Sequence, residues 1–270
     1  MFHHNKEECP PGTVPIQRMK YNFSEEKLLN DDILIKDIPG VHVAETFIPQ
    51  SYAPLYQVNG ISSLYNPKVE KGQISMSHIW VENGPVQSSN RITMGWHVHP
   101  AMYGDAKTHF YTSWTVDRKN FPGGYFRDTS TYGGPTYEVY MAITQDPKTK
   151  NWWIIAGKVN MGYYPAALFS NLGSASIVGW GGRTKANVGG HSPPMGSGHF
   201  PDGNRTHESY FRSPKIQGSS LIVYTPDSYM TKDFSDNTNC YAVSYHDKYY
   251  GEVYNEGVVQ FGGPGGKCGI

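Results

Sequence analysis

Residues 92–100 read ITMGWHVHP, a pattern typical of a buried strand that ends at a proline. In an extended strand, consecutive side chains point to opposite faces of the sheet. The apolar side chains share one face, which we expect to pack on the core: Met94, Trp96 and Val98. The opposite face carries a hydroxyl, a glycine and two imidazoles: Thr93, Gly95, His97 and His99. This second face is a candidate cleft, and a solvated face with two surface histidines is the alternative.

The composition limits the fold and the partners. The 270 residues include 23 basic and 23 acidic side chains, so no cationic surface for nucleic acid or anionic lipid is indicated. Charged residues make up only 17%, whereas 30 Gly, 19 Pro and 20 Tyr favour short strands and turns. The sequence has no apolar run long enough to span a bilayer and no secretory signal after Met1. We therefore expect no nucleic-acid partner and no membrane partner, and a cytosolic protein if Met1 is the native start.

Strand-like runs recur between turn signals from residue 41 onward. They cover residues 41–48, 56–64, 73–81, 92–98, 109–116, 137–144, 152–159, 175–180, 219–224, 241–246 and 257–261. Segments rich in glycine and proline, such as 121–124 (FPGG) and 132–135 (YGGP), are expected to be turns. Many short strands at this spacing predict an all-β fold, mostly antiparallel. We predict an N-terminal arm or linker over residues 1–40 and one β domain over residues 41–270.

Histidines are the strongest candidates for chemistry, because imidazole transfers protons near neutral pH. His78 lies in another predicted strand and is expected to face the same cleft as His97 and His99, which makes these three the leading acid/base candidates. Their spacing also fits a metal site with His109 or Asp105 as a further ligand, but paired surface histidines more often bind nothing. We therefore predict no metal and no cofactor.

Other familiar catalytic patterns are missing from the sequence. It has no nucleophile elbow, Walker loop, dinucleotide fingerprint, HExxH or CxxC motif. The few carboxylates that merit attention form no obvious pair: Glu82, Asp105, Asp117 and Glu138. A paired-carboxylate mechanism therefore has no support in these positions.

Cysteines and sequons bear on the compartment. Cys240 and Cys268 both lie near the C-terminus beside turn residues, so a disulfide and two separate thiols are both open. Cys9 is left over if the other two pair. The N-x-Ser/Thr sequons at Asn22 and Asn204 are candidate glycosylation sites and are compatible with a secretory origin.

Eight short stretches occur in a characteristic order along the chain. They are residues 8–16 (ECPPGTVPI), 95–100 (GWHVHP), 103–105 (YGD), 151–153 (NWW), 162–166 (GYYPA), 180–182 (WGG), 195–200 (MGSGHF) and 261–268 (FGGPGGKC). Together they resemble the neprosin family of plant proteins, from about residue 5 to the C-terminus. The resemblance rests on order and spacing and not on any single motif. It implies a β-sandwich of two long, curved antiparallel sheets with a cleft across one of them.

The resemblance also carries expectations about processing and activity. It implies secretion as a zymogen to an extracellular or vacuolar site, with an N-terminal activation domain upstream of Cys9. That domain would be missing from this chain and would hold the partner of Cys9. A disulfide between Cys240 and Cys268 is implied as well. The family's characterised activity is that of a glutamic endopeptidase that acts at acid pH and prefers proline at the cleavage site.

Glutamic peptidase chemistry needs two glutamates, one to activate water and one to act as acid and stabilise the oxyanion. In the family pattern these glutamates occupy the positions that hold Thr93 and Arg183 here. A threonine cannot act as a general base, and an arginine is a permanent cation. His78, His97 and His99 also stand where the family commonly carries other residues. We therefore expect the two-glutamate activity to be lost.

Three functions remain open. The leading one is a repurposed enzyme that performs acid/base chemistry on a small molecule or peptide with a new set of groups: His78, His97, His99, Thr93 and Arg183. The second is an inactive pseudo-peptidase that binds a peptide or cell-wall glycan through aromatic side chains: Trp96, Trp180, Tyr163 and Tyr164. The third is an active proline-directed endopeptidase with relocated catalytic groups such as Glu138.

Overall fold

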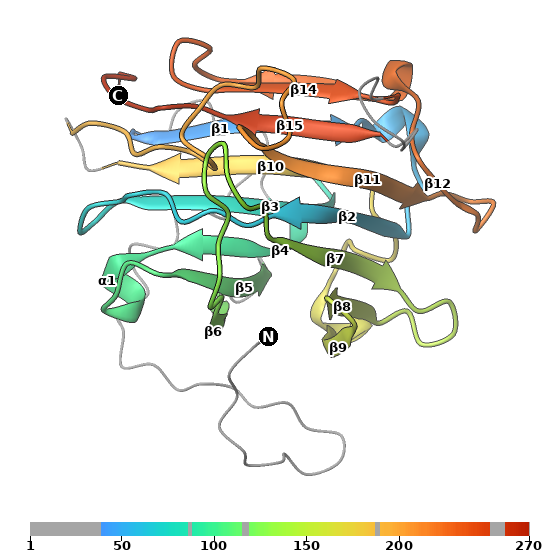
Figure 1. Ribbon diagram of the computed structural model, residues 1–270. Coiled ribbons are helices and arrows are strands. Elements are labelled where there is room, and N and C mark those ends of the chain that lie inside the picture. The colour runs from blue at the N-terminus through green and yellow to red at the C-terminus, as the bar shows by residue number, and fades with distance from the viewer. Residues whose placement is uncertain (1–38, 86–87, 115–118, 187–189, 249–256, 270) are drawn as a thin grey trace.

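The computed structural model describes residues 39–85, 88–114, 119–186, 190–248 and 257–269. Cys9, Asn22, Asp117 and all but the last two residues of the predicted arm lie outside this part of the chain. Antiparallel strands form two sheets that stack as layers (Figure 1). The prediction of an all-β antiparallel sandwich is therefore confirmed.

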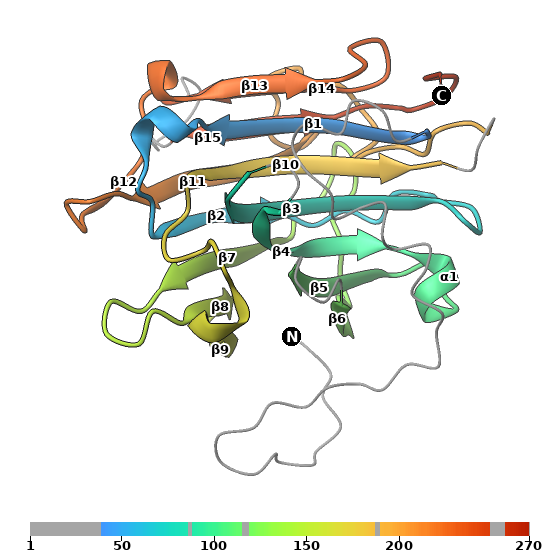
Figure 2. The same cartoon turned by 180° about the vertical axis from the view of Figure 1, so that it is seen from behind.

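The first layer is a seven-stranded antiparallel sheet, which faces the viewer in Figure 2. Its strands follow in the order β13 (Lys232–Ser235), β1 (Val41–Ile48), β10 (Ile177–Lys185), β3 (Ile74–Asn83), β4 (Asn90–Val98), β5 (Thr108–Trp114) and β6 (Lys119–Tyr125). The only α-helical turn of the described residues, α1 (Pro100–Tyr103), connects β4 to β5. This sheet brings together most of the polar residues that the sequence singles out.

The second layer is an eight-stranded antiparallel sheet, in front in Figure 1. Its strands follow in the order β14 (Ala242–His246), β15 (Val258–Gly262), β11 (Ser209–Gln217), β2 (Gln57–Ser63), β7 (Glu138–Gln145), β8 (Trp152–Ala156) and β9 (Val159–Tyr164), and β12 (Val223–Tyr224) pairs with β11. Three single-turn 3-10 helices lie in the connections: η2 (Gln50–Tyr52), η4 (Ala166–Leu168) and η5 (Ser228–Met230). Among the described residues, no helix is long and apolar enough to cross a membrane.

Two tryptophans join the layers across the core. Trp96 of β4 and Trp180 of β10 are fully buried in the cluster that both sheets share. Each indole N–H crosses to a backbone carbonyl of the other sheet, Trp96 to Ser63 at 2.9 Å and Trp180 to Asn59 at 2.8 Å. Large aromatic side chains dominate core energetics, and their buried N–H groups need a partner. These two residues therefore fix how the seven-stranded sheet sits on the eight-stranded one.

Four strands were not predicted from the sequence: β6, β9, β11 and β13. β6 contains the FPGG segment that was expected to be a turn, and it lies at the edge of its sheet, where proline is tolerated. In β11 the pairing with β2 shifts between Arg212 and Lys215, and Ser213 has a φ of 48°. A bulge of this kind interrupts the alternation by which a strand is recognised in a sequence.

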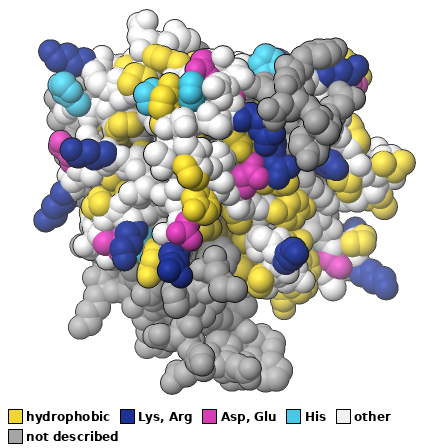
Figure 3. All heavy atoms as spheres, viewed as in Figure 1, with side chains coloured by type: hydrophobic (Ala, Val, Ile, Leu, Met, Phe, Trp, Pro, Cys, Tyr) yellow, Lys and Arg dark blue, Asp and Glu magenta, His cyan; other side chains and the backbone are white. Residues whose placement is uncertain are grey.

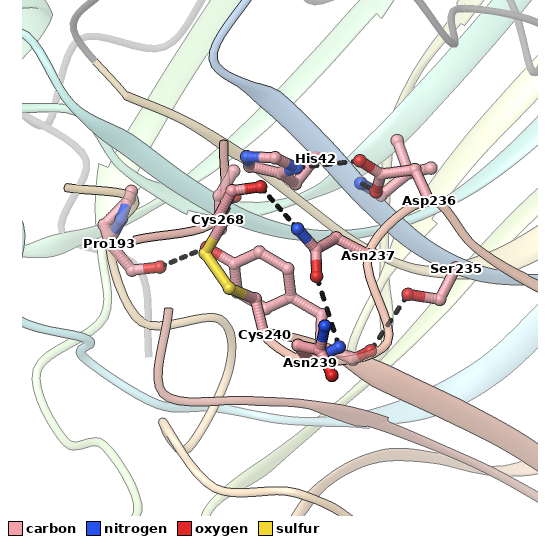
Figure 4. Close-up of a disulfide and its surroundings, with 11 residues drawn as sticks. His42, Pro193, Ser235, Asp236, Asn237, Asn239, Cys240 and Cys268 are labelled. Carbon is pink, nitrogen blue, oxygen red and sulfur yellow. Dashed lines mark hydrogen bonds and ion pairs between the residues drawn. A yellow bond between two sulfur atoms is a disulfide. The ribbon is translucent and has the colours of Figure 1, made fainter. Parts of the chain in front are cut away.

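A disulfide joins Cys240 to Cys268 near the C-terminus (Figure 4), as the resemblance implied. The residue after Cys240 is Tyr241, whose hydroxyl donates to the Pro193 carbonyl at 2.7 Å and accepts from Thr184 of β10 at 3.0 Å. The disulfide thus ties the C-terminal segment to the strand that carries Arg183.

Candidate functional site

The outward face of the seven-stranded sheet carries one row of residues that crosses five strands. Register pairs align Glu45 of β1, Gly181 of β10, His78 of β3, Gly95 of β4 and Tyr111 of β5. Gly181 and Gly95 have no side chain. The side chains of Glu45, His78 and Tyr111 therefore contact one another across the strands that carry these glycines. The His78 Nε2 lies 2.8 Å from the Glu45 Oε1, and its Nδ1 lies 3.2 Å from the Tyr111 hydroxyl.

The charge states of Glu45, His78 and Tyr111 determine which group donates each of these hydrogen bonds. Burial lowers the pKa of His78 to about 4 against the opposing effect of Glu45, so the imidazole is neutral at pH 7. Burial would raise the pKa of Glu45, but Arg183 and then His78 outweigh it and hold that pKa well below its usual range. Burial also raises the pKa of the Tyr111 phenol. Tyr111 therefore donates to Nδ1 of His78, whose Nε2–H donates to the Glu45 carboxylate.

Arg183 is ion-paired at the position where the resemblance expects the second glutamate. Its Nε donates to the Glu45 Oε1 at 2.6 Å and its Nη2 to the Oε2 at 3.3 Å, and both side chains are buried. Arg91 lies 3.8 Å from Glu45 and 3.5 Å from Glu82, and its guanidinium stacks on Trp80 at 4.2 Å. Two arginines and two glutamates thus balance each other in charge.

Thr93 shares this face at the position expected for the first glutamate. Its hydroxyl accepts a hydrogen bond from the Arg91 Nε at 3.3 Å. Thr93 and Arg183 are therefore linked through Arg91 and Glu45. We use the name outer-face cluster for this set of residues: Glu45, His78, Glu82, Arg91, Thr93, Tyr111 and Arg183. In this cluster both carboxylates lie beside guanidinium groups.

A second group on the same face consists of stacked rings. His97 stacks on Tyr111 at 4.4 Å between ring centroids, and its Nε2 lies 2.7 Å from the Tyr103 hydroxyl. Tyr103 stacks in turn on His109 at 3.6 Å, and the His109 Nε2 lies 2.9 Å from Asp105. Burial, followed by the nearby His99 and His109, lowers the pKa of His97 well below its usual value. We call Tyr111, His97, Tyr103 and His109 the aromatic row.

His99 lies at the end of this row, directly before α1. Its ring centroid is 5.9 Å from that of His97, and burial with the nearby Lys185 lowers its pKa to about 4. Within the described part of the chain, no group of three or more His, Cys, Asp or Glu side chains is arranged to hold a metal ion. His97 thus packs between aromatic rings, whereas His78 contacts the Glu45 carboxylate.

Several predicted site residues lie elsewhere. Trp96 and Trp180 are 0% exposed and belong to the core, so their predicted ligand contacts are corrected to a packing role. Tyr164 is also buried and its hydroxyl lies 2.8 Å from that of Thr112, whereas Tyr163 is 47% exposed on β9 of the other sheet. Each of these side chains points away from the outer-face cluster.

The relocated carboxylate of the third hypothesis also lies on the other sheet. Glu138 of β7 accepts hydrogen bonds from Arg212 at 2.8 Å and from Tyr210. It belongs to the outward face of the eight-stranded sheet, on the opposite side of the sandwich from Thr93. The structure therefore does not bring Glu138 to the expected cleft.

Sequence reasoning missed Glu45, the centre of the cluster. A signal was present, because alternation over residues 41–48 places Glu45 on the same face as Val43 and Phe47, where an isolated carboxylate is unusual. The partners of Glu45 come from β10 and β3, and no local pattern shows that these strands lie side by side. The same holds for Arg91 and Tyr111.

One family model and two solved structures match this chain. The model of the family described as Neprosin matches residues 71–264, well over half of the chain. Two crystal structures of scytalido-glutamic peptidase are similar in fold, one with a peptide-based transition state analog and one with a transition state analog inhibitor. Each is 9% identical and covers 82% of this chain and 97% of the other, with TM-scores of 0.49 and 0.46. By the extent of the family match, this chain belongs to the Neprosin family.

Proposed function

We propose that this chain binds polypeptide on the outward face of the seven-stranded sheet and does not hydrolyse it by the two-glutamate mechanism. The observation that carries the proposal is the buried ion pair between Arg183 and Glu45. In this reading, a peptidase-related scaffold retains its binding face but has a charge-balanced network at the former catalytic positions.

The network lacks the group that water activation needs. A general base works best when its pKa lies near the operating pH, and Glu45 is held far below that by Arg183. Glu82 lies beside Arg91, and Thr93 supplies only a hydroxyl. Glu45 already neutralises the Arg183 cation. Little of the positive electrostatic potential of Arg183 therefore remains to stabilise an oxyanion. These features together oppose hydrolysis.

The aromatic row supports binding of an extended, proline-containing segment. Aromatic rings offer flat apolar surfaces on which proline rings pack, and an extended proline-rich chain loses little entropy on binding. Tyr103 is the member of the row that is partly exposed, next to the buried His97 and His109. The family resemblance, with its preference for proline, points in the same direction.

A second candidate is an acid/base enzyme, which the hydrogen-bonded chain from Glu45 through His78 to Tyr111 favours. The order carboxylate, imidazole, hydroxyl is the one that activates nucleophiles in several enzyme classes. The raised pKa of Tyr111 and the lowered pKa of His78 both oppose transfer of the phenol proton. We therefore rank the acid/base enzyme below the polypeptide-binding function.

One assay distinguishes the two candidates. The wild-type chain is incubated with a fluorescent proline-rich peptide from pH 2.5 to 8, with products followed by mass spectrometry and binding by anisotropy. We expect binding without cleavage, and a loss of about fivefold in affinity for Tyr103→Ala because one stacked aromatic side chain contributes about 1 kcal/mol. Tyr163→Ala removes an exposed tyrosine of the other sheet and should bind as wild type.

Three outcomes would contradict the proposal. Cleavage by the wild-type chain at any of these pH values would show that hydrolysis persists, and its loss in His78→Asn would establish the second candidate. A wild-type chain with no measurable affinity at millimolar peptide would remove the binding function. Equal losses in Tyr103→Ala and Tyr163→Ala would place the peptide elsewhere.

We also propose that the chain passes through the secretory pathway and is glycosylated at Asn204. The disulfide and the geometry of the sequon support this, because Asn204 is exposed and its Oδ1 accepts from the backbone N–H and hydroxyl of Thr206 at 3.1 and 2.9 Å. Secreted from a eukaryotic host behind a signal peptide, the chain should lose mass on treatment with an N-glycosidase. The loss should be smaller or absent in Asn204→Gln; equal losses in both would contradict the assignment.

A further inference from the structure

Glu208 is a fully buried carboxyl on the eight-stranded sheet, away from the outer-face cluster. It directly precedes β11, and its Oε1 accepts a hydrogen bond from Gln260 of the neighbouring β15. Its Oε2 has no hydrogen-bond partner among the described residues. Leaving a buried carboxylate oxygen unpaired is costly, and much less so when the group is neutral.

The loop of residues 199–207 packs beside Glu208. Tyr132 is stacked between His199 and His207 of this loop, with centroid distances of 3.8 and 4.5 Å. His207 also lies 2.8 Å from Asp202. In Figure 3, which views the outward face of the eight-stranded sheet, histidines lie beside hydrophobic side chains near the upper edge. These contacts pack the loop against Tyr132.

Backbone contacts secure the same loop at Thr206. Its carbonyl accepts from the Gly133 N–H at 2.8 Å and from the Tyr65 hydroxyl at 3.4 Å. Tyr65 lies just beyond the end of β2, and Gly133 follows Tyr132. The loop is thus joined to the segments that carry Tyr65 and Gly133.

The groups that face Glu208 favour its neutral form. Burial raises its pKa to about 7 against hydrogen bonds from Gln260 and the Gly203 backbone, and the Asp202 carboxylate adds to the rise. Of the other titratable side chains, the phenol of Tyr65 interacts with Glu208, whereas Arg205 and His207 of the loop stack on Tyr210 and Tyr132. From β15 and β14 the facing groups are uncharged: Gln260 and Ser244.

We propose that Glu208 is a proton-controlled latch: protonated, it lets the loop of residues 199–207 close over the sheet, and ionised, it favours loop opening. Opening would return the carboxylate to water and separate it from Asp202. The closed state holds the proton more tightly than the open state. Loop opening therefore becomes easier as pH rises from about 4.5 to about 7, and levels off above that.

Hydrogen exchange followed by mass spectrometry tests the latch. Peptides that cover residues 128–137 and 197–209 are measured from pH 5 to 8 in the intact chain, with rates corrected for intrinsic exchange. In wild type, the opening equilibrium constant should rise by up to about tenfold per pH unit and by 10- to 100-fold, roughly, between pH 5 and 7.5. Glu208→Gln should abolish this rise, and Glu70→Gln, a change at an exposed glutamate, should keep it.

Two results would overturn the latch: protection that is independent of pH in wild type, or the same dependence in Glu208→Gln. If Glu208→Gln does not fold, the carboxyl ¹³C titration of Glu208 in the wild-type chain decides, and a midpoint near 4.5 refutes the proposal. Gln260→Leu removes the donor to the Glu208 Oε1 and should move that midpoint higher. None of these outcomes depends on peptide binding at the other sheet.

Discussion

Arg183→Met should lower the free energy of unfolding by about 3–5 kcal/mol at pH 7, because it leaves the Glu45 carboxylate buried without its main cation. Arg183 makes two hydrogen bonds to that carboxylate, at 2.6 and 3.3 Å. His78 and Arg91 remain nearby, but His78 must take up a proton in a buried place to compensate. Urea denaturation at pH 7 measures the loss.

Two further variants show whether the unpaired charge is the cause. Glu45→Gln combined with Arg183→Met removes both charges and should recover much of the loss. Arg212→Met breaks the partly exposed pair with Glu138 and should cost about 1 kcal/mol or less. A loss in Arg183→Met no larger than that in Arg212→Met would contradict the structural importance of the buried pair.

The same pair has a consequence for acid stability. The pKa of Glu45 is lowered in the folded state, so its contribution is present above the unfolded value near 4.5 and is lost as pH falls below it. Wild-type stability should therefore decline more steeply below pH 4.5 than that of the Glu45→Gln/Arg183→Met double variant.

Trp180→Ala should cost about 3–5 kcal/mol, as expected for the removal of a large aromatic side chain from a core. The indole is fully buried, and its N–H donates to the Asn59 carbonyl of the opposite sheet. The variant leaves a cavity and removes the hydrogen bond to the Asn59 carbonyl between the sheets. Loss of peptide binding in this variant would therefore follow from loss of folding.

Calorimetry and circular dichroism measure this effect without any ligand. Trp153→Ala is the matched control, because Trp153 is only partly buried and packs on Tyr163 at the sheet surface. It should cost clearly less. If Trp180→Ala kept wild-type stability and lost only peptide binding, the assignment of Trp180 to the core would be wrong.

The fold was predictable where a strand has one apolar and one polar face. In β4, the alternation of Met94 and Trp96 with Thr93 and His97 specifies both the extended conformation and the side that packs on the other sheet, although both faces of β4 are buried. The edge strand β6 was not predictable in this way, because its proline and glycines are also typical of turns. Turn signals and edge-strand signals overlap, so local sequence alone does not separate them.

The candidate site was predictable only in part. Alternation places Thr93 and His97 on one face, and the family resemblance adds Arg183. The contact of Glu45 with His78 and Arg183 depends on the register of β1, β10 and β3, which is set by long-range pairing. The sequence therefore identifies Arg183 only as a permanent cation in place of a glutamate, and its buried partner Glu45 is seen only in the folded chain.

Gly95 and Gly181 limit how the outward face of the seven-stranded sheet can change in this protein. A Cβ at Gly95 would lie 1.9 Å from the Ser77 carbonyl oxygen, and one at Gly181, where φ is +150°, would lie 2.3 Å from that of Ala44. Side chains at these positions would force the backbone to move, whereas the neighbouring positions in the row hold the buried side chains of Glu45, His78 and Tyr111. Substitution of Glu45, His78 or Tyr111 would therefore change the chemistry of the row without a new side chain meeting the backbone, whereas substitution of either glycine would disturb the sheet itself.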